Sequence, residues 1–331
     1  MGPFGGTAKG GARHAGRIAA AAAVLAALAI GLPTYAAYRR DIRAARARVA
    51  SGSLIAETRS GPIEYAIVGE GSPVLMVHGA GGGYDQGLDI GAPLARNGMR
   101  IIAMSRFGYL RTPLPPEAAA AAQADAHAHL LDALGIARAA IIGASAGALS
   151  AMQFALRHRE RCSALVLLVP VAYVPRPGGA PSISAPPGIR HALEWALRSD
   201  FLFWAVPRVR RGAVIRAFLG TPPEVVARAS AAEQARVATM LDHILPIAPR
   251  RAGLMNDAKL VTSIERYELE RIAVPTLALS AADDLYGTFD AAKYTAEHIA
   301  GARFIGYPGG GHLCVGYEDD VVTQIAAFLS Q

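Results

Sequence analysis

One pentapeptide, Gly143-Ala144-Ser145-Ala146-Gly147, has the residue types that a nucleophilic serine needs. An apolar run, Ala139–Ile142, precedes it, and a helix-forming stretch follows it. In such a strand–turn–helix setting the two glycines permit a sharp bend, which exposes the serine hydroxyl at a helix N-terminus. The GxSxG pattern alone is weak, because an ordinary glycine turn between a strand and a helix can produce it. Its setting predicts that Ser145 is a nucleophile.

A second feature is the glycine-rich run His78–Gly83, HGAGGG, which follows the apolar segment Val74–Val77. A turn of this composition lets backbone N–H groups face an oxyanion. We expect Ala146, the residue after the serine, to provide one N–H donor and Ala80 the other, with Gly81 as the alternative. A phosphate site fits less well, because no GK[ST] and no suitably followed GxGxxG is present. His78 is expected to brace the loop.

Two more strand ends could complete a proton-transfer chain. The run Thr276–Leu279 leads to the adjacent acids Asp283 and Asp284, and either carboxylate could orient a histidine. The run Arg303–Tyr307 leads to a glycine-rich turn that presents His312. Serine, aspartate and histidine, in that chain order and each just after a strand, suit a nucleophile, an orienting acid and a general base.

These groups need a framework that brings strand ends together. Apolar runs predict strands at Ile63–Val68, Val74–Val77, Arg100–Met104, Ala139–Ile142, Ala164–Val169, Thr276–Leu279 and Arg303–Tyr307. Helical stretches alternate with them at Glu117–Leu134, Ala148–His158, Asp290–Ile299 and Asp319–Leu329. Continuous apolar strands that alternate with helices predict an α/β fold with a doubly wound, mostly parallel sheet.

The alternation stops over residues 171–271. Pro175–Gly188 is rich in proline, glycine and serine and is expected to be a linker. Helices are predicted after it, at His191–Val206, Ala213–Leu219, Pro223–Leu245 and Leu254–Ile264. An all-helical insertion of this length is expected to cap the carboxyl edge of the sheet, where such folds bind ligands. Its aromatic residues could line a substrate pocket, although most are expected to pack within the cap: Trp195, Phe201, Phe203, Trp204 and Phe218.

The N-terminal region has a different character. Residues 18–38 are uncharged and long enough for a bilayer, between a basic tail at 1–17 and an Arg-rich stretch at 39–53. They predict a single-pass anchor in a lipid bilayer, expected to be a bacterial inner membrane, followed by a polar stalk over 39–53. A cleaved signal peptide and secretion are the alternative. The basic residues on the two sides nearly balance and leave the orientation open.

Charge and cysteine content exclude several function classes. The chain has 331 residues and a net charge of +7, but residues 1–50 hold eight bases and one acid, which leaves 25 of each in the remainder. The remainder of the chain therefore has no net charge, whereas a nucleic-acid-binding domain needs an excess of basic residues. Two cysteines, Cys162 and Cys314, make no disulfide framework, and no Cys/His spacing indicates a metal.

Over roughly residues 54–330 the chain resembles the α/β-hydrolase fold family. The resemblance rests on the elbow with Gly143 and Gly147, on the His78-Gly79 loop, and on the two later strand ends. It implies a core over 54–170 and 272–331, and a cap over 171–271. The family's base maps onto His312. Its acid maps onto Asp283, because family spacing counts three residues from Ser280. The turn beginning at Ser105 departs from the family pattern, which has aspartate there.

The resemblance implies a serine hydrolase of small to medium, fairly apolar carboxylic esters or related acyl substrates. Ser145 would attack a carbonyl, and water would release the acyl enzyme. No cofactor and no metal are implied. A carbon–carbon bond hydrolase, a cofactor-free peroxidase and a serine peptidase use the same triad and stay open. A membrane-tethered binding protein without activity is the alternative from another class. The oligomeric state is not indicated.

Overall fold

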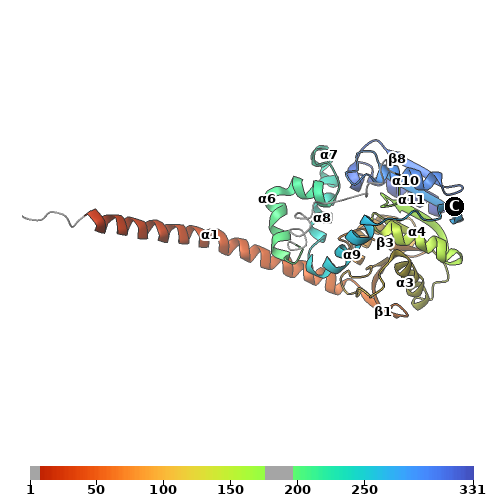
Figure 1. The fold of residues 1–331 in the computed structure, drawn as a ribbon, viewed down its shortest axis with the longest axis horizontal. Helices are drawn as coiled ribbons and strands as arrows, with labels where there is room; N and C mark the ends of the chain where they lie inside the picture. Colours follow the sequence, from red (N-terminus) through yellow and green to blue (C-terminus); the bar gives the residue numbers. More distant parts are fainter. Residues whose placement is uncertain (1–7, 176–196) are drawn as a thin grey trace, which may run out of the picture. The chain divides into compact units, whose positions relative to one another are not determined.

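A computed structural model of the chain describes residues 8–175 and 197–331 (Figure 1). Its described part contains an eight-stranded sheet with the strand order β1-β2-β4-β3-β5-β6-β7-β8. The strands are β1 (Leu54–Thr58), β2 (Gly61–Val68), β3 (Ser72–Val77), β4 (Met99–Met104), β5 (Ala139–Ala144), β6 (Cys162–Leu168), β7 (Thr276–Ala281) and β8 (Arg303–Tyr307). β2 pairs antiparallel with β1 and β4, and all other pairs are parallel.

Helices cover both faces of the sheet. On one face, α3 (Ala120–Ala133), α4 (Gly147–Arg157) and α10 (Thr288–Glu297) contribute to one apolar core. On the other face, α2 (Tyr84–Ala95) and α11 (Glu318–Leu329) contribute to a second core. Strands β5 and β7 are buried at every position, which explains their continuous apolar sequences. The predicted doubly wound, mostly parallel α/β sheet is confirmed.

All seven predicted strands are present as β2 to β8, and β1 was missed. In β1, at the sheet edge, only Ala56 is buried, so this strand has no long apolar run to indicate it. The register places Val77 beside Gly143, and Leu168 beside Ala144 and Leu279. The carboxyl ends of β3, β5, β6 and β7 therefore meet at one edge, where the predicted chemical residues lie.

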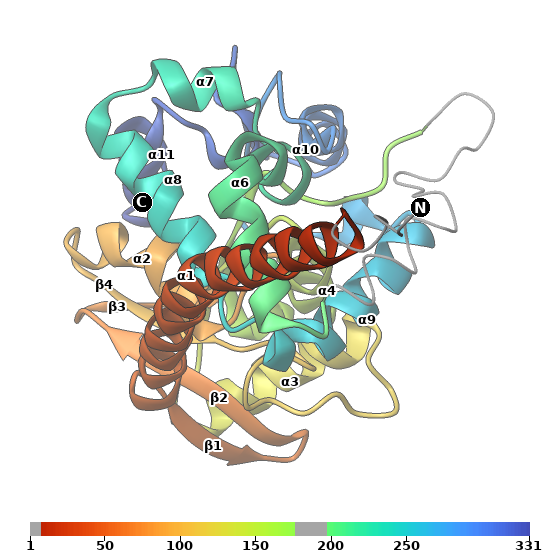
Figure 2. The ribbon, with the colours of Figure 1, turned by 90° about the vertical axis from the view of Figure 1, so that its left-hand side faces the viewer.

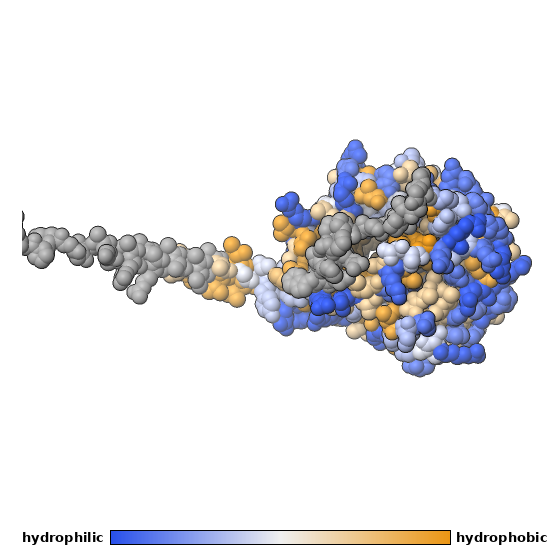
Figure 3. All heavy atoms as spheres, viewed as in Figure 1, coloured by the Kyte–Doolittle hydropathy of each residue, from blue (hydrophilic) through white to orange (hydrophobic). Residues whose placement is uncertain are grey.

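The cap has four helices, α6 (Asp200–Phe218), α7 (Pro223–Arg228), α8 (Ala231–His243) and α9 (Arg251–Thr262). In Figure 2, α6 and α7 lie on the side of the body away from β1. Ile215, Val237 and Ile244 belong to a small apolar core of their own. Polar residues dominate the outer surface on the face in Figure 3, with scattered apolar patches.

Two helix predictions in the cap are corrected. The predicted helix Pro223–Leu245 is two helices, because the chain extends at Ala229 and Ser230 caps α8 with a hydrogen bond from Glu233 N. The predicted helix His191–Val206 begins only at Asp200 within its described part, and it continues as α6, interrupted at Arg210. Residues 191–196, with Trp195, lie outside the described residues, as does nearly all of the predicted linker Pro175–Gly188.

At the N-terminal end, α1 spans Ala8–Ser51. The compact body begins at Arg46, within the predicted stalk 39–53. Among the residues whose side chains the structure describes, no helix is long and apolar enough to cross a membrane. The predicted span 18–38 lies partly outside that set.

Candidate active site

Ser145 lies in a strained turn between β5 and α4. Its φ of 49° is in the left-handed region, which a serine rarely adopts, and Ser145 N donates to the carbonyl of Leu168 on β6. A Cβ at residue 147 would lie 2.5 Å from the carbonyl oxygen of Val77, and one at residue 143 would lie 2.6 Å from Ala151 Cβ. Glycine is therefore required at both positions, because α4 starts so close to β3 and β5.

The histidine partner is held from behind by Asp284. His312 follows β8 and lies in the short helix η5 (Gly311–Leu313), where its Nδ1 donates to Asp284 Oδ2 at 2.7 Å. The Asp284 carboxylate is fully buried and also accepts hydrogen bonds from Tyr286 N and the Thr288 hydroxyl. Burial would raise the pKa of Asp284, but His312 and these donors lower it below its usual value.

The prediction that Asp283 orients the histidine is therefore wrong. After β7, the chain turns with Asp284 N donating to the Ala281 carbonyl, and this turn directs Asp284 inward beneath His312. Asp283 faces the glycine-rich turn instead, and its Oδ1 accepts the Gly311 N–H at 2.7 Å. Asp283 fixes the loop that carries the base, whereas Asp284 contacts the base itself.

The loop His78–Gly83 passes close to the serine. A Cβ at residue 79 would lie 3.0 Å from Ser145 Cβ, so the first glycine allows this approach. Gly81 N donates to Tyr109 Oη at 3.3 Å, which makes Gly81 a poor choice for the second oxyanion donor. Within the described part of the chain, the N–H groups of Ala80 and Ala146 have no protein acceptor. The arrangement favours Ala80 and Ala146 as the oxyanion donors.

His78 braces this loop, as the sequence predicts. It is completely buried, its Nδ1 donates to the Gly79 carbonyl at 2.7 Å, and its Nε2 accepts Arg106 N–H at 2.9 Å. Burial and the nearby Arg106 charge lower the pKa of His78 well below its usual value. A neutral imidazole with both nitrogens engaged is a structural member of the loop.

Ser145 and His312 line a cavity of about 660 Å³. Ala80 and Ala146 line the same cavity, so the predicted nucleophile, the predicted base and the expected oxyanion donors share one space. Most of the other lining residues are apolar and come from the sheet edge and the cap, among them Ile90, Leu168, Val171, Leu219, Met240, Ile244, Leu254 and Met255. The charged side chains among them are Arg236, Asp257, Lys259 and Glu318.

A family model with the description "alpha/beta hydrolase fold" matches residues 72–318. The chain belongs to the α/β-hydrolase fold family. A putative carbamate hydrolase, RutD, from Klebsiella pneumoniae is 29% identical over 77% of this chain and 90% of its own length. A 2-hydroxy-6-oxo-6-phenylhexa-2,4-dienoate hydrolase from Comamonas testosteroni is 34% identical over 33% of this chain. That match spans 40% of the relative's length.

Solved structures have the same fold. An α/β hydrolase fold protein from Nakamurella multipartita has a TM-score of 0.65 at 27% identity, covering 84% of this chain and 99% of that one. An esterase from Exiguobacterium antarcticum has a TM-score of 0.63 at 20% identity, covering 84% of this chain and 98% of its own. The identity to the esterase is low, so that likeness concerns the fold alone.

In the turn after β4, where the family pattern has an aspartate, this chain has a serine that is paired with a glutamate from β2. Ser105 stands where the family turn has aspartate, and its hydroxyl donates to Glu64 Oε2 at 2.8 Å. Glu64 lies on β2, is fully buried, and also accepts from the backbone and side chain of Arg111. A carboxylate from the neighbouring strand thus supports this turn. Sequence patterns did not indicate Glu64, because its partner Arg111 is distant along the chain.

The cap also supports the base, which the sequence did not reveal. His312 N donates to the carbonyl of Gly220, and Leu313 N donates to Thr221 Oγ1 at 3.2 Å. The ring of Tyr286 packs edge-on against His312, with the ring centroids 4.9 Å apart. Residues from cap and core therefore fix the histidine loop together.

Three other predictions concern aromatic residues, cysteine and metal. Phe218 lines the cavity, whereas Trp204 is buried and stacks with Phe201, which is exposed on the cap. Phe203 packs against Phe218 with the ring centroids 4.9 Å apart.

Burial raises the pKa of the Cys314 thiol to about 12, which suits an inert side chain. In the described ranges, no group of three His, Cys, Asp or Glu side chains could hold a metal ion.

Proposed function

We propose that this α/β hydrolase cleaves small to medium, fairly apolar carboxylic esters through an acyl enzyme on Ser145. The observation that carries the proposal is the common cavity: Ser145 on its strained turn and His312, held by Asp284, line one mostly apolar space of about 660 Å³. A cavity of this size suits a small molecule with an apolar acyl or alcohol group.

The chemistry follows from the positions of the polar atoms. Ser145 Oγ attacks the ester carbonyl while His312 Nε2 takes the hydroxyl proton, and Asp284 stabilises the imidazolium through Nδ1. The N–H groups of Ala80 and Ala146 stabilise the tetrahedral oxyanion. The carbon–oxygen bond to the alcohol then breaks, and the leaving oxygen receives the proton from His312. His312 then deprotonates water, which attacks the acyl carbon. The bond to Ser145 Oγ breaks, the acid leaves, and His312 returns the proton to Ser145.

Hydrolysis of a hydroxy-oxo-dienoate is the second candidate, because the relative from Comamonas testosteroni is named for such a substrate. A dienoate carries a carboxylate that needs a cation in the pocket. The cavity residue Arg236 is already paired with Glu233 and Glu318, at 2.8 and 2.9 Å. Arg236 is therefore not a preformed anion site, which leaves Lys259 as the other cation in the lining. The mostly apolar remainder of the lining favours the uncharged ester as substrate.

Covalent labelling tests the proposed function. A fluorophosphonate probe should label the wild-type chain, and Ser145→Ala should abolish both the labelling and the turnover of p-nitrophenyl esters. Profiling esters of increasing acyl length beside a dienoate and a peptide substrate then ranks the substrate classes. Turnover of the dienoate above all esters would replace the ester proposal by the second candidate. A wild-type chain without labelling and turnover would contradict a serine hydrolase.

We also propose that residues 18–38 anchor the protein in a membrane as a single-pass segment. The support is the uncharged stretch between Arg17 and Arg39, which is long enough to cross a bilayer. An inserted segment should keep the full chain in the membrane pellet through high salt and alkaline carbonate. A soluble product whose N-terminus lies near Ala37 would show that the segment is a cleaved signal.

A further inference from the structure

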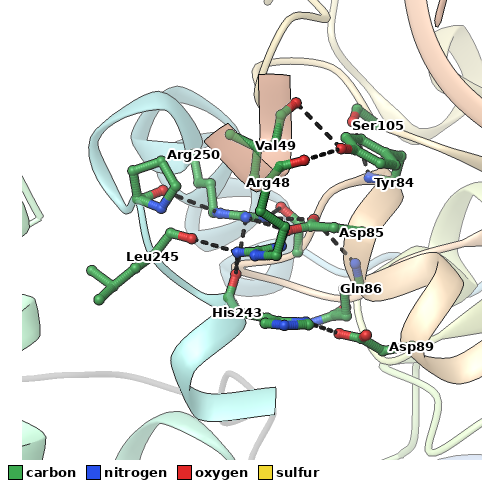
Figure 4. Close-up of polar contacts among 12 residues, drawn as sticks. Arg48, Val49, Tyr84, Asp85, Gln86, Asp89, Ser105, His243, Leu245 and Arg250 are labelled. Atoms are coloured by element: carbon green, nitrogen blue, oxygen red, sulfur yellow. Dashed lines mark hydrogen bonds and ion pairs between the residues drawn. The ribbon is translucent and has the colours of Figure 1, made fainter. Parts of the chain in front are cut away.

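A buried carboxylate next to the oxyanion loop connects three parts of the molecule (Figure 4). Asp85 lies in the first turn of α2, directly after the loop, and is almost fully buried. Its Oδ2 accepts hydrogen bonds from Arg48 Nη1 at 2.5 Å and from Arg250 Nη2 at 2.6 Å. Its Oδ1 accepts from Arg250 Nη1 at 3.0 Å. Asp85 thus joins the end of α1 and the cap to the start of α2.

Arg250 forms a direct hydrogen bond between the cap and the oxyanion loop. It is completely buried, and its Nη1 donates to the Gly82 carbonyl at 2.7 Å. Its remaining donors reach Asp85 and the carbonyls of His243 and Pro246, so every N–H of the guanidinium is used. Gly82 N in turn donates to the Gly79 carbonyl, which places Arg250 one hydrogen bond from the backbone turn around Ala80.

Arg48, in the last turn of α1, completes this arrangement. Its Nη2 donates to the carbonyls of His243 at 3.1 Å and Leu245 at 2.7 Å, so Arg48 and Arg250 share both the His243 carbonyl and Asp85. The hydroxyl of Tyr84 is within hydrogen-bond distance of the carbonyls of Arg48 and Val49. Two consecutive residues at the start of α2, Tyr84 and Asp85, therefore hold the end of α1.

The charge balance of the network depends on both arginines. Burial would raise the pKa of Asp85, but the ion pairs with Arg250 and Arg48 lower it far below its usual value. Loss of Arg48 would leave the carbonyls of His243 and Leu245 without this donor, and it would remove one of two cations from a buried carboxylate. The cap segment and Asp85 would then be free to shift, and Gly82 moves with them through Arg250.

We propose that Arg48 is a positioning residue for the oxyanion loop and acts through Asp85 and Arg250. The proposal rests on the proposed function, because the loop matters for rate only if it binds an oxyanion. It also gives the last turn of α1 a part in the active site, beyond any role in attachment.

Full-length Arg48→Met, which keeps most of the aliphatic stem, tests this against Arg43→Met. Arg43 is an exposed arginine on the same helix. Arg48→Met should lower kcat on a preferred ester about tenfold with KM little changed, less than the roughly 10²–10³ for loss of an oxyanion donor itself. A trifluoromethyl ketone, which binds as an oxyanion, should lose affinity by the same factor. Arg48→Lys should recover part of both losses, and Arg43→Met should match the wild type.

Hydrogen exchange of peptides over residues 79–87 gives a readout that needs no turnover. Exchange there should be faster in Arg48→Met than in Arg43→Met. Equal exchange and equal kcat in the two variants would overturn the proposal. Should Arg48→Met fail to fold, Arg48→Lys decides: faster exchange over 79–87 supports the positioning role, and wild-type exchange overturns it. A wild-type chain without acyl turnover, but with faster loop exchange in Arg48→Met, would contradict the proposed function and not the network.

Discussion

Two adjacent aspartates at the end of β7 have different tasks because the turn after the strand sends them in different directions. Asp284 is buried beneath His312 and contacts its Nδ1, whereas Asp283 accepts the N–H of Gly311 in the loop that carries the base. The two residues are neighbours in the chain, yet one contacts the imidazole and the other supports the loop that carries it. Spacing cannot decide between them, because it does not specify the geometry of the turn.

Replacing Asp284 by asparagine should lower kcat for ester hydrolysis by about 10⁴, the loss found when the orienting acid of a triad is neutralised. The amide cannot stabilise the imidazolium, and it favours the wrong tautomer of His312. Asp283→Asn is the matched neighbour and should cost much less, because only the Gly311 hydrogen bond weakens. Steady-state kinetics on one ester decides the order. A larger loss for Asp283→Asn would return the orienting role to that residue.

At the scale of elements, the cap is tied to the core by buried charges as well as apolar contacts. Arg106, from the turn after β4, forms a bidentate pair with Asp257 on α9, at 2.7 and 2.6 Å. Tyr109 Oη donates to Asp257 and accepts from Gly81 N in the oxyanion loop. The pair therefore links the cap, the core turn and the loop beside Ser145.

Asp257→Asn should lower the free energy of unfolding by about 3–5 kcal/mol, because it leaves the guanidinium of Arg106 buried without its counter-charge. Denaturant unfolding followed by fluorescence measures the change. Glu224→Gln removes a comparable pair with Arg216 on the cap surface, where both side chains are more than half exposed, and should change stability little. Equal losses in the two variants would show that the buried pair contributes no more to the free energy of unfolding than the surface pair.

At the scale of the whole molecule, the sequence predicts those features of the fold and the site that depend on local residue patterns. The sheet, the helices on both faces, Ser145 on its turn and His312 on its loop follow from apolar runs and glycine spacing. Contacts between distant segments were not predictable in this way: Glu64 with Ser105, Thr221 with the histidine loop, and Asp85 with two arginines. The first contact depends on which strands are neighbours in the sheet, and the other two depend on where cap residues and the last turn of α1 contact the core. No local pattern specifies either.

Stability should fall as the pH decreases below about 6.5, because the core contains histidines that stay neutral in the fold. Burial lowers the pKa of His127 to about 3, and its ring lies 3.0 Å from both Met104 S and Ser150 Oγ. The folded pKa lies below the unfolded value, so the unfolded chain binds the proton first and is stabilised relative to the fold as the pH falls. Each such histidine should cost about 1.4 kcal/mol per pH unit below its unfolded pKa.

The variant His127→Gln isolates this contribution, since glutamine does not titrate and can keep a hydrogen bond to Ser150. Urea unfolding of the wild type and the variant between pH 7 and pH 5 measures the free energy of unfolding as a function of pH. The two free energies should converge as the pH falls, because the variant's value depends less steeply on pH. Between those limits the buried carboxylates add little, because the pKa values of Asp85 and Asp284 are lowered and their stabilisation is lost only in stronger acid. A residual slope is expected from His78, which is buried and neutral in the same way. Parallel curves for the two proteins would mean that His127 takes up a proton within the fold, and that its helix opens to water more readily than its complete burial implies.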